Sequence, residues 1–254
     1  FKVRAGQFYT PLGYENYDIS PATLETVDFS NIVYRIACRN PYSYNLVDYG
    51  RDLGVMLMGD IDKYFHYDFA VTNGSIPCKD DNNNTKDIYA SVTIKPFKNF
   101  NVKATYNWGE YNPQALAGGT APGIGVSKYM PMNRFVVGAW YNDPNGLDLR
   151  AEYGFMKSDK GGDTYVDEQG AYVLAGYHAG KFLPIVRWDM YKDDVNKTSA
   201  GCNYNRILVG CTYQLFKNVK IQLNYGHFMY SDDVKNAGGL EKSEQVQLMG
   251  LFKF

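Results

Sequence analysis

The sequence predicts an all-β fold, an antiparallel up-and-down transmembrane β-barrel with twelve strands in this chain. Three observations support this fold. Apolar and polar residues alternate with period two in segments of about ten residues. Short and long connections join these segments in strict alternation, and aromatic residues gather at both ends of the apolar faces.

The alternation of apolar and polar residues is clearest in four segments. In 100–108 and 246–254 the apolar face occupies even-numbered positions, and in 147–155 and 219–225 it occupies odd-numbered positions. Successive side chains of a strand point to opposite faces of a sheet. Each segment therefore predicts a strand with one apolar face.

Applied along the whole chain, the pattern predicts strands at residues 1–9, 50–60, 64–73, 87–97, 100–110, 133–142, 147–157, 170–179, 182–192, 204–215, 219–230 and 242–254. Short turns at 61–63, 98–99, 143–146, 180–181 and 217–218 alternate with long connections at 10–49, 74–86, 111–132, 158–169, 193–203 and 231–241. All short turns thus lie at one end of the sheet, as in barrels with periplasmic turns and external loops. Pro184 cannot donate a backbone hydrogen bond, so we expect a bulge or a strand start there.

A soluble β-sandwich also has one apolar face per strand, and the position of the aromatic residues separates the two folds. Small or aliphatic residues such as Ala104, Val137 and Ala151 lie in mid-strand. The aromatic residues lie at the strand ends, as in the two girdles of a membrane barrel. Those toward the long connections are Trp108, Tyr106, Phe155, Tyr153, Trp188 and Tyr225, and those toward the turns are Phe97, Phe100, Tyr141, Phe182, Tyr213, Phe252 and Phe254. The sequence therefore predicts a barrel in contact with the lipid of a bacterial outer membrane.

The composition argues against a nucleic-acid-binding protein, a membrane-spanning helix and a metal site. With 26 Lys and Arg against 27 Asp and Glu, the formal net charge is −1, whereas nucleic-acid-binding proteins need a basic excess. The longest apolar runs, 135–141 and 171–177, are far shorter than the roughly 18 residues of a membrane-spanning helix. The four cysteines have no CxxC or Cys/His spacing, so we expect no metal site and no cofactor.

Three segments carry a family resemblance. They are 6–15 (GQFYTPLGYE), 50–55 (GRDLGV) and 71–74 (VTNG), and their order and spacing resemble the phosphate-selective porin (O/P) family of Gram-negative outer membranes. The resemblance implies that 10–49 is a long constriction-type loop within the single barrel domain 1–254. It also implies a complete barrel of sixteen strands, four of which precede this chain. A twelve-stranded barrel that closes by itself is the alternative.

If the apolar faces meet lipid, the opposite positions point into the lumen. The acidic residues there are Asp52, Asp68, Asp148, Glu152 and Asp189, and the basic residues are Lys2, Arg4, Lys95, Lys103, Arg134, Arg150, Arg187, Arg206, Lys220 and Lys253. All the basic residues except Lys253 are candidate pore-lining residues. A basic lumen favours anions, and guanidinium groups hydrogen-bond phosphate or carboxylate. In the alternative interpretation these charges only keep the channel wet, with Arg150 beside Glu152 and Arg187 beside Asp189 neutralising each other.

The loop 10–49 has mixed charge. Arg35 and Arg39 are its basic candidates at the constriction, and Glu15 and Asp18 lie among its acidic residues. We expect a porin that lets small hydrophilic solutes diffuse passively, with a mild preference for anions and with phosphate as a candidate solute. The resemblance also implies a homotrimer.

Two functions from other classes are alternatives to a channel. An outer-membrane hydrolase needs a His beside a nucleophile or paired acids. His66 and Asp68 share a face but have no Ser nearby in the sequence, so we expect no enzyme. A barrel that serves as a scaffold for surface or periplasmic proteins is the second alternative, and whether the lumen is open separates it from a porin.

Overall fold

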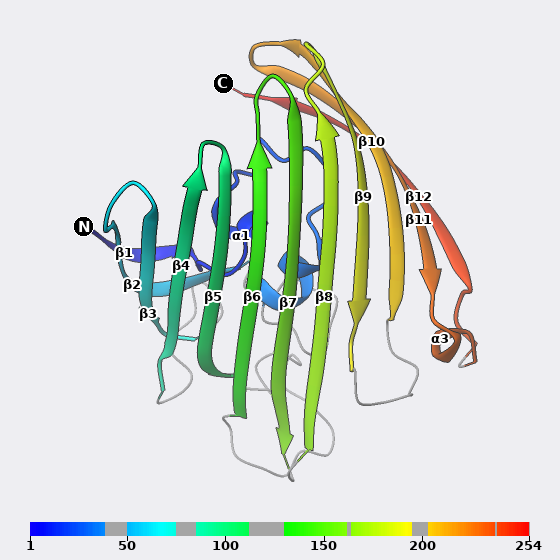
Figure 1. Cartoon of the computed structure of the whole chain (residues 1–254). Helices are drawn as coiled ribbons and strands as arrows, with labels where there is room; N and C mark the ends of the chain where they lie inside the picture. The colour runs from blue at the N-terminus through cyan, green and yellow to red at the C-terminus, as the bar shows by residue number, and fades with distance from the viewer. Residues whose placement is uncertain are drawn as a thin grey trace.

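The computed structural model describes residues 1–38, 50–74, 85–111, 130–161, 164–194, 203–236 and 238–253. Twelve strands form one antiparallel sheet in which each strand pairs with the next one along the chain. Figure 1 shows this sheet as a curved wall, with the short turns at the top. The up-and-down topology predicted from the alternation is confirmed.

The strand bounds follow the predicted segments closely, which confirms all twelve. The strands are β1 (Lys2–Tyr9), β2 (Arg51–Asp60), β3 (Phe65–Thr72), β4 (Asp87–Phe97), β5 (Phe100–Tyr111), β6 (Met130–Asn142), β7 (Leu147–Gly161), β8 (Thr164–Tyr177), β9 (Phe182–Lys192), β10 (Tyr204–Phe216), β11 (Val219–Tyr230) and β12 (Lys242–Phe252). A short helix, α3 (Asp232–Asn236), lies between β11 and β12. Among the described residues, no helix is both long enough and apolar enough to cross a membrane.

The predicted long connection at 158–169 is wrong, because β7 and β8 continue through most of it as a hairpin. Ser158 pairs with Val166, and Asp159 pairs with Tyr165. This part of the hairpin carries polar residues on both faces, so it lacks the alternation that marked the other strands. Pro184 is the third residue of β9 and pairs with Cys211 of β10 in regular register, so the predicted bulge or strand start is wrong. The proline is tolerated because pairing of β9 with β8 begins only at Ile185.

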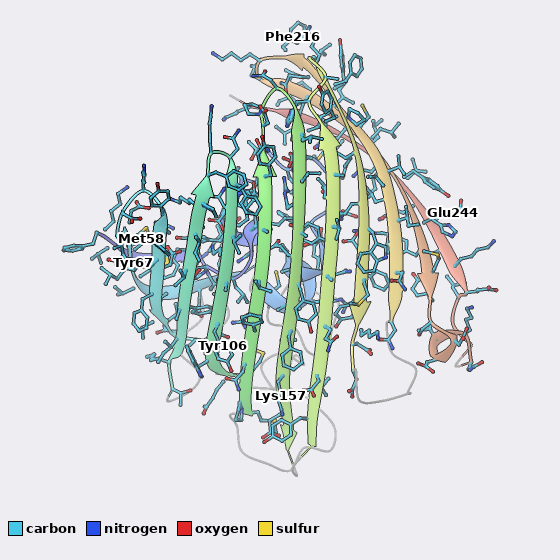
Figure 2. The ribbon with its side chains drawn as sticks, viewed as in Figure 1. Met58, Tyr67, Tyr106, Lys157, Phe216 and Glu244 are labelled. Atoms are coloured by element: carbon cyan, nitrogen blue, oxygen red, sulfur yellow. The ribbon has the colours of Figure 1, made fainter. Side chains whose placement is uncertain are left out.

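The two faces of the sheet have the inside-out character of a membrane barrel. On β9, Val186 and Trp188 are 48% and 39% exposed, whereas Arg187 and Asp189, which alternate with them, are 0% exposed. Figure 2 shows side chains along both faces of the wall, with Phe216 at the turn end and Lys157 at the opposite end. Exposed aromatic residues lie near both ends of the convex face, among them Trp108, Tyr153, Phe97, Phe182 and Phe252. This arrangement fits lipid outside and water or packed chain inside.

The two edge strands β1 and β12 are not paired with each other, since the strand order runs from β1 to β12 without a closing pair. The self-closing twelve-stranded barrel is therefore not the arrangement seen here. That four strands precede the chain stays a prediction.

Residues 10–38, which we call the inner segment, lie on the concave face of the sheet (Figure 1). They contain a four-residue helix, α1 (Tyr14–Tyr17), and a π-helix, η1 (Ile32–Ala37). The main apolar cluster of the molecule lies where this segment meets the wall. It includes Leu12, Ile32 and Ile36 of the segment together with Met132 and Met156 of the strands. Apolar contact therefore holds the segment against a wall that is otherwise largely polar.

Candidate functional site

The start of the inner segment is fixed by backbone contacts. The amide of Thr10 donates to the carbonyl of Gly50 at 2.9 Å, so the chain returns to β2 close to where it left β1. Gly13 has φ +87°, a left-handed conformation that favours glycine. It lets the next amide, that of Tyr14, donate to Glu152 Oε1 on β7 at 2.6 Å.

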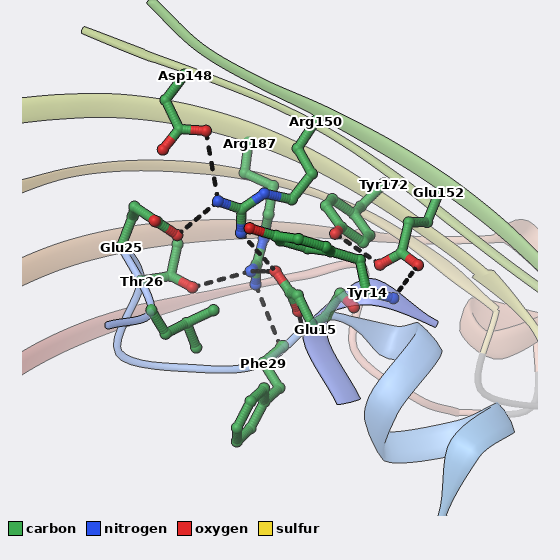
Figure 3. Close-up of polar contacts among 12 residues, drawn as sticks. Tyr14, Glu15, Glu25, Thr26, Phe29, Asp148, Arg150, Glu152, Tyr172 and Arg187 are labelled. Atoms are coloured by element: carbon green, nitrogen blue, oxygen red, sulfur yellow. Dashed lines mark hydrogen bonds and ion pairs between the residues drawn. The ribbon is translucent and has the colours of Figure 1, made fainter. Parts of the chain in front are cut away.

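A buried network of charges joins the middle of the inner segment to the wall (Figure 3). Arg150 Nη2 on β7 donates to Glu25 Oε2 at 2.9 Å and lies 3.4 Å from Asp148 Oδ1. The Glu15 carboxylate lies between two guanidiniums, with Oε1 at 3.8 Å from Arg150 Nη1 and 3.6 Å from Arg187 Nη1. Loop carboxylates thus neutralise arginines that the sequence placed in the lumen.

The prediction that Arg150 and Glu152 neutralise each other is wrong. Glu152 instead accepts hydrogen bonds from the Tyr14 amide and from the Tyr172 hydroxyl, the latter at 2.7 Å. Its two oxygens are occupied, and the inner segment supplies Glu25 to Arg150 in its place. The partner prediction for Arg187 is confirmed, because its Nε lies 3.0 Å from Asp189 Oδ2.

Arg187 and Arg206 hold the stretch 26–29 of the inner segment. Arg187 donates to the Thr26 hydroxyl at 3.0 Å and to the carbonyl oxygens of Asp28 and Phe29. Arg206 pairs with Asp189 at 3.0 Å and lies 3.7 Å from the Asp28 carboxylate. Both guanidiniums therefore bind acceptors of the protein itself, in the fork geometry that suits them.

Arg134 binds the end of η1. Its Nη1 donates to the carbonyl oxygens of Ile36 at 3.2 Å and Ala37 at 2.9 Å, groups that a helix end leaves without intrahelical partners. The same guanidinium donates to Asn107 Oδ1 at 2.7 Å and to the Tyr89 hydroxyl at 2.6 Å. Arg134 thus acts as a cap for the π-helix.

The apolar side of η1 packs on two glycines of the wall. A Cβ atom at Gly154 of β7 would lie 2.6 Å from Ile36 Cδ1 and 2.8 Å from Ile32 Cδ1. At Gly170 of β8 the corresponding distances are 3.5 Å and 3.6 Å. The closest approach of the helix to the wall therefore depends on the missing side chain at Gly154.

The other edge of the inner segment is held by β3 and β5. Lys103 Nζ on β5 donates to Asp18 Oδ2 at 2.7 Å and lies 4.3 Å from the centre of the Tyr17 ring. The Tyr17 hydroxyl donates to Asp68 Oδ1 at 2.9 Å, and His66 Nε2 lies 3.3 Å from the same oxygen. The predicted proximity of His66 and Asp68 is therefore present, and Asp68 also accepts the hydrogen bond of Tyr17 from the inner segment.

The remaining candidate residues have different surroundings. Lys95 pairs with Asp60 at 3.2 Å near the turn end, and Arg35 of η1 stacks on the Tyr191 ring at 4.8 Å. Lys2 and Arg4 lie exposed on the edge strand, opposite Met58 and Met56 of the concave face. Arg39 lies outside the described residues.

Burial raises the pKa of several groups of the inner segment, among them Glu25 and Tyr34. Burial raises the pKa of the Glu25 carboxyl above its ordinary value, against the opposing attraction of Arg150, and Asp148 adds repulsion. Burial also raises the pKa of Tyr34 to about 12, with Asp28 adding to the shift. Among the residues with a described position, no group of three or more His, Cys, Asp or Glu side chains could hold a metal ion.

The whole chain, residues 1–254, matches the family described as "Putative beta-barrel porin-2, OmpL-like". The chain belongs to this family. It is a porin of the bacterial outer membrane, a family of passive channels. The match confirms the predicted resemblance to porins but does not extend it to the phosphate-selective O/P family. No curated protein matches the chain.

Solved structures share the fold of this porin. OmpF of Salmonella typhi in complex with daunomycin has a TM-score of 0.66 at 18% identity, covering 98% of this chain and 73% of that one. The anion-selective porin from Comamonas acidovorans has a TM-score of 0.64 at 14% identity, covering 98% and 69%. OmpT of Vibrio cholerae in its trimer form has a TM-score of 0.58 at 14% identity, covering 98% and 74%. At these identities the likeness shows the fold alone.

Sequence reasoning missed the aromatic residues that support the network of this porin. Arg150 lies over the Tyr14 ring at 4.6 Å, Arg187 lies 5.9 Å from the centre of the Tyr172 ring, and Tyr89 binds Arg134. Tyr89 and Tyr172 occupy inward positions of their strands, where a tyrosine stands out among charged residues. Their inward position could have identified them from the sequence, because a buried tyrosine hydroxyl needs a polar partner.

Proposed function

We propose that this porin is a diffusion channel for small hydrophilic solutes with a mild preference for anions, phosphate among them. The inner segment, as part of the loop 10–49, forms its constriction. The nine basic residues named from the sequence line the wall around it, several of them as anchors of the segment.

The anion preference rests on the basic residues that keep their charge unpaired. Lys2 and Arg4 are exposed on the concave face and have no acidic partner among the described residues. By contrast, Lys103, Arg150 and Arg187 are paired with carboxylates, so their charges largely cancel. Exposed fixed cations lower the barrier for anions entering a water-filled path.

Strict phosphate selectivity is not part of the proposal. Selectivity for phosphate would need guanidiniums free to bind it in fork geometry. The donors of Arg134 and Arg187 are engaged by carbonyl, hydroxyl and carboxylate groups of the protein. We therefore expect the channel to pass phosphate as one anion among several.

We also propose that the porin assembles as a homotrimer in the outer membrane, with lipid around the remaining convex surface. Support comes from the shared fold with the trimer form of OmpT of Vibrio cholerae and from the apolar convex face. Cross-linking of the porin in detergent, followed by mass determination, tests this part.

Reversal potentials in planar bilayers under a KCl gradient test the channel proposal. A potential of the sign set by chloride is the expected result, and a potential set by potassium contradicts the anion preference. A folded protein that inserts but conducts no ions contradicts the channel itself and favours the scaffold alternative.

A further inference from the structure

Two basic side chains near the turn end of the wall differ from the anchoring arginines. Lys220 at the start of β11 is 7% exposed, and its Nζ donates to the carbonyl oxygen of Leu24 at 2.7 Å. Lys181, in the turn before β9, reaches only the Leu215 carbonyl oxygen, at 3.5 Å. Neither lysine forms an ion pair with an acidic residue of the described chain. A nearly buried ammonium group without an ion-pair partner is costly and attracts an anion, and the Glu25 carboxylate acts on Lys220 only from beyond ion-pair distance.

These two lysines line one pocket of about 270 Å³ between the inner segment and the strands β9 to β11. The inner segment contributes residues 22–25, and the turn between β8 and β9 contributes His178. The hydroxyl-bearing residues Thr23 and Thr212 also line it. The pocket is much larger than the space a single water needs.

The acidic groups at this pocket are already engaged elsewhere. Glu25 lines it, but its Oε2 accepts the hydrogen bond of Arg150. Asp148 lies 3.7 Å from His178 Nε2, and it also accepts from Asn142 at 3.0 Å and contacts Arg150. His178 Nε2 is buried and makes no hydrogen bond within the described chain. The balance of the lining is therefore cationic, with a spare imidazole nitrogen.

We propose that this pocket is a binding subsite for small oxyanions, with Lys181 and Lys220 as the charged ligands. The proposal rests on the channel function above. It adds a site on the turn-end side of the constriction at which an anion binds transiently. Ammonium groups bind phosphate as point charges, and the imidazole of His178, whose Nε2 makes no hydrogen bond within the described chain, adds a hydrogen bond to another oxygen. The hydroxyls of Thr23 and Thr212 already donate to the carbonyl oxygens of Ser20 and Glu25. The site adjoins the guanidinium network, because Glu25 lines the pocket and also accepts from Arg150. Its two charged ligands are ammonium groups, and no arginine of the described chain is in the lining.

Inhibition of the chloride current by inorganic phosphate tests the subsite. The porin is inserted in a planar bilayer in symmetric KCl, and phosphate is added to each side in turn. We expect phosphate to reduce the current, with the stronger effect from one side. Charge-assisted hydrogen bonds are worth about 1.5–3 kcal/mol, so the double variant Lys181→Gln/Lys220→Gln should raise the half-inhibitory phosphate concentration about 10- to 100-fold.

Two further variants keep the test clean. Lys181→Gln alone changes an exposed side chain that packs against little, so its effect on phosphate inhibition does not depend on folding. Lys217→Gln removes an equal charge from the adjacent turn, outside the pocket lining, and should leave inhibition unchanged. The carbonyl of Leu24 keeps Gln222 as a donor, at 2.8 Å, when Lys220 is replaced.

The outcomes separate this inference from the channel proposal. If the porin prefers chloride but phosphate does not inhibit, or if it inhibits the double variant as strongly as the wild type, the subsite is wrong and the channel function stands. If the porin prefers potassium, the anion preference fails, and the phosphate titration of the variants still decides the subsite.

Discussion

The Arg150 guanidinium on β7 and the Glu25 carboxylate of the inner segment form a buried ion pair, with Nη2 and Oε2 2.9 Å apart. The two residues are 125 positions apart in the chain. Because Glu15 and Asp148 share the same guanidinium, one side chain joins two points of the inner segment to the wall. The position of the constriction therefore depends on Arg150.

Replacing Arg150 by Met should release the inner segment. The substitution leaves the Glu25 carboxylate buried without its cation, whereas Glu15 keeps Arg187 at 3.6 Å. Breaking a buried pair in this way costs about 3–5 kcal/mol. We expect a lower free energy of unfolding in urea and a larger, noisier single-channel conductance. Lys157→Met removes a charge from the same strand on the opposite face and should change neither quantity. Equal conductance of the Arg150→Met variant and the wild type would show that the pair does not position the constriction.

A second prediction concerns the glycines beneath η1. Gly154→Ala places a methyl group where Ile32 and Ile36 already lie within 3 Å of the Cβ position. Overpacking of this kind costs about 1–3 kcal/mol, so the variant should unfold at lower urea concentration and bind η1 less tightly. Gly170→Ala, with distances of 3.5 Å and 3.6 Å to the same atoms, is the matched control and should be close to neutral. Equal stability of the two variants would refute the close packing.

The strands could be predicted from the sequence because the environment imposes the pattern on every second residue. On β9, Val186 and Trp188 face outward and suit lipid, whereas the alternating residues Arg187 and Asp189 face the interior. The pattern failed at 158–169, where both faces of the hairpin are polar and the backbone pairing alone continues the strands. The negative mean hydropathy, −0.39, of a chain with 16% aromatic residues has the same cause.

The candidate site was predictable only in part. The alternation of inward and outward positions along the strands predicts that Arg134, Arg150 and Arg187 lie on the inner face, where all three are buried. It could not show that they bind the inner segment, since those contacts depend on how a loop folds back over the wall. The four-residue spacing of Ile32 and Ile36 was a local sign of a helical turn with one apolar side. His178 and Lys181 lie in a turn, where no alternation marks a residue as functional.

The raised pKa of Glu25 predicts a pH-dependent stability. Five carboxylates, those of Glu15, Glu25, Asp28, Asp148 and Asp189, surround the three guanidiniums of Arg150, Arg187 and Arg206. Burial raises the pKa of the Glu25 carboxyl against the attraction of Arg150, and Asp148 adds repulsion. The folded porin therefore holds a proton on Glu25 at a pH where the unfolded chain, with the ordinary pKa of 4.5, has lost it. The contribution of this group to stability is complete below the unfolded value and is lost as the pH rises through the folded one.

Glu25→Gln mimics the protonated form and does not titrate. As the pH rises above 4.5, the free energy of unfolding of the wild type should fall relative to that of the variant. Urea unfolding in detergent at a series of pH values measures this difference. Parallel profiles for the two proteins would show that Glu25 has an ordinary pKa.

The last prediction concerns the unpaired charges of β1. Because Lys2 and Arg4 are exposed on the concave face without acidic partners, their charges act on ions through water. A charge pair at contact distance in water is worth about 1 kcal/mol, so Lys2→Gln/Arg4→Gln should reduce the chloride-to-potassium permeability ratio about two- to fivefold. The effect should shrink in high salt, where the screening length is only about 3 Å at 1 M. Lys63→Gln/Lys98→Gln removes two charges from the turns and serves as the control, since these residues lie off the concave face. An unchanged ratio in the first variant, at low salt as well as high, would move the source of the anion preference away from β1.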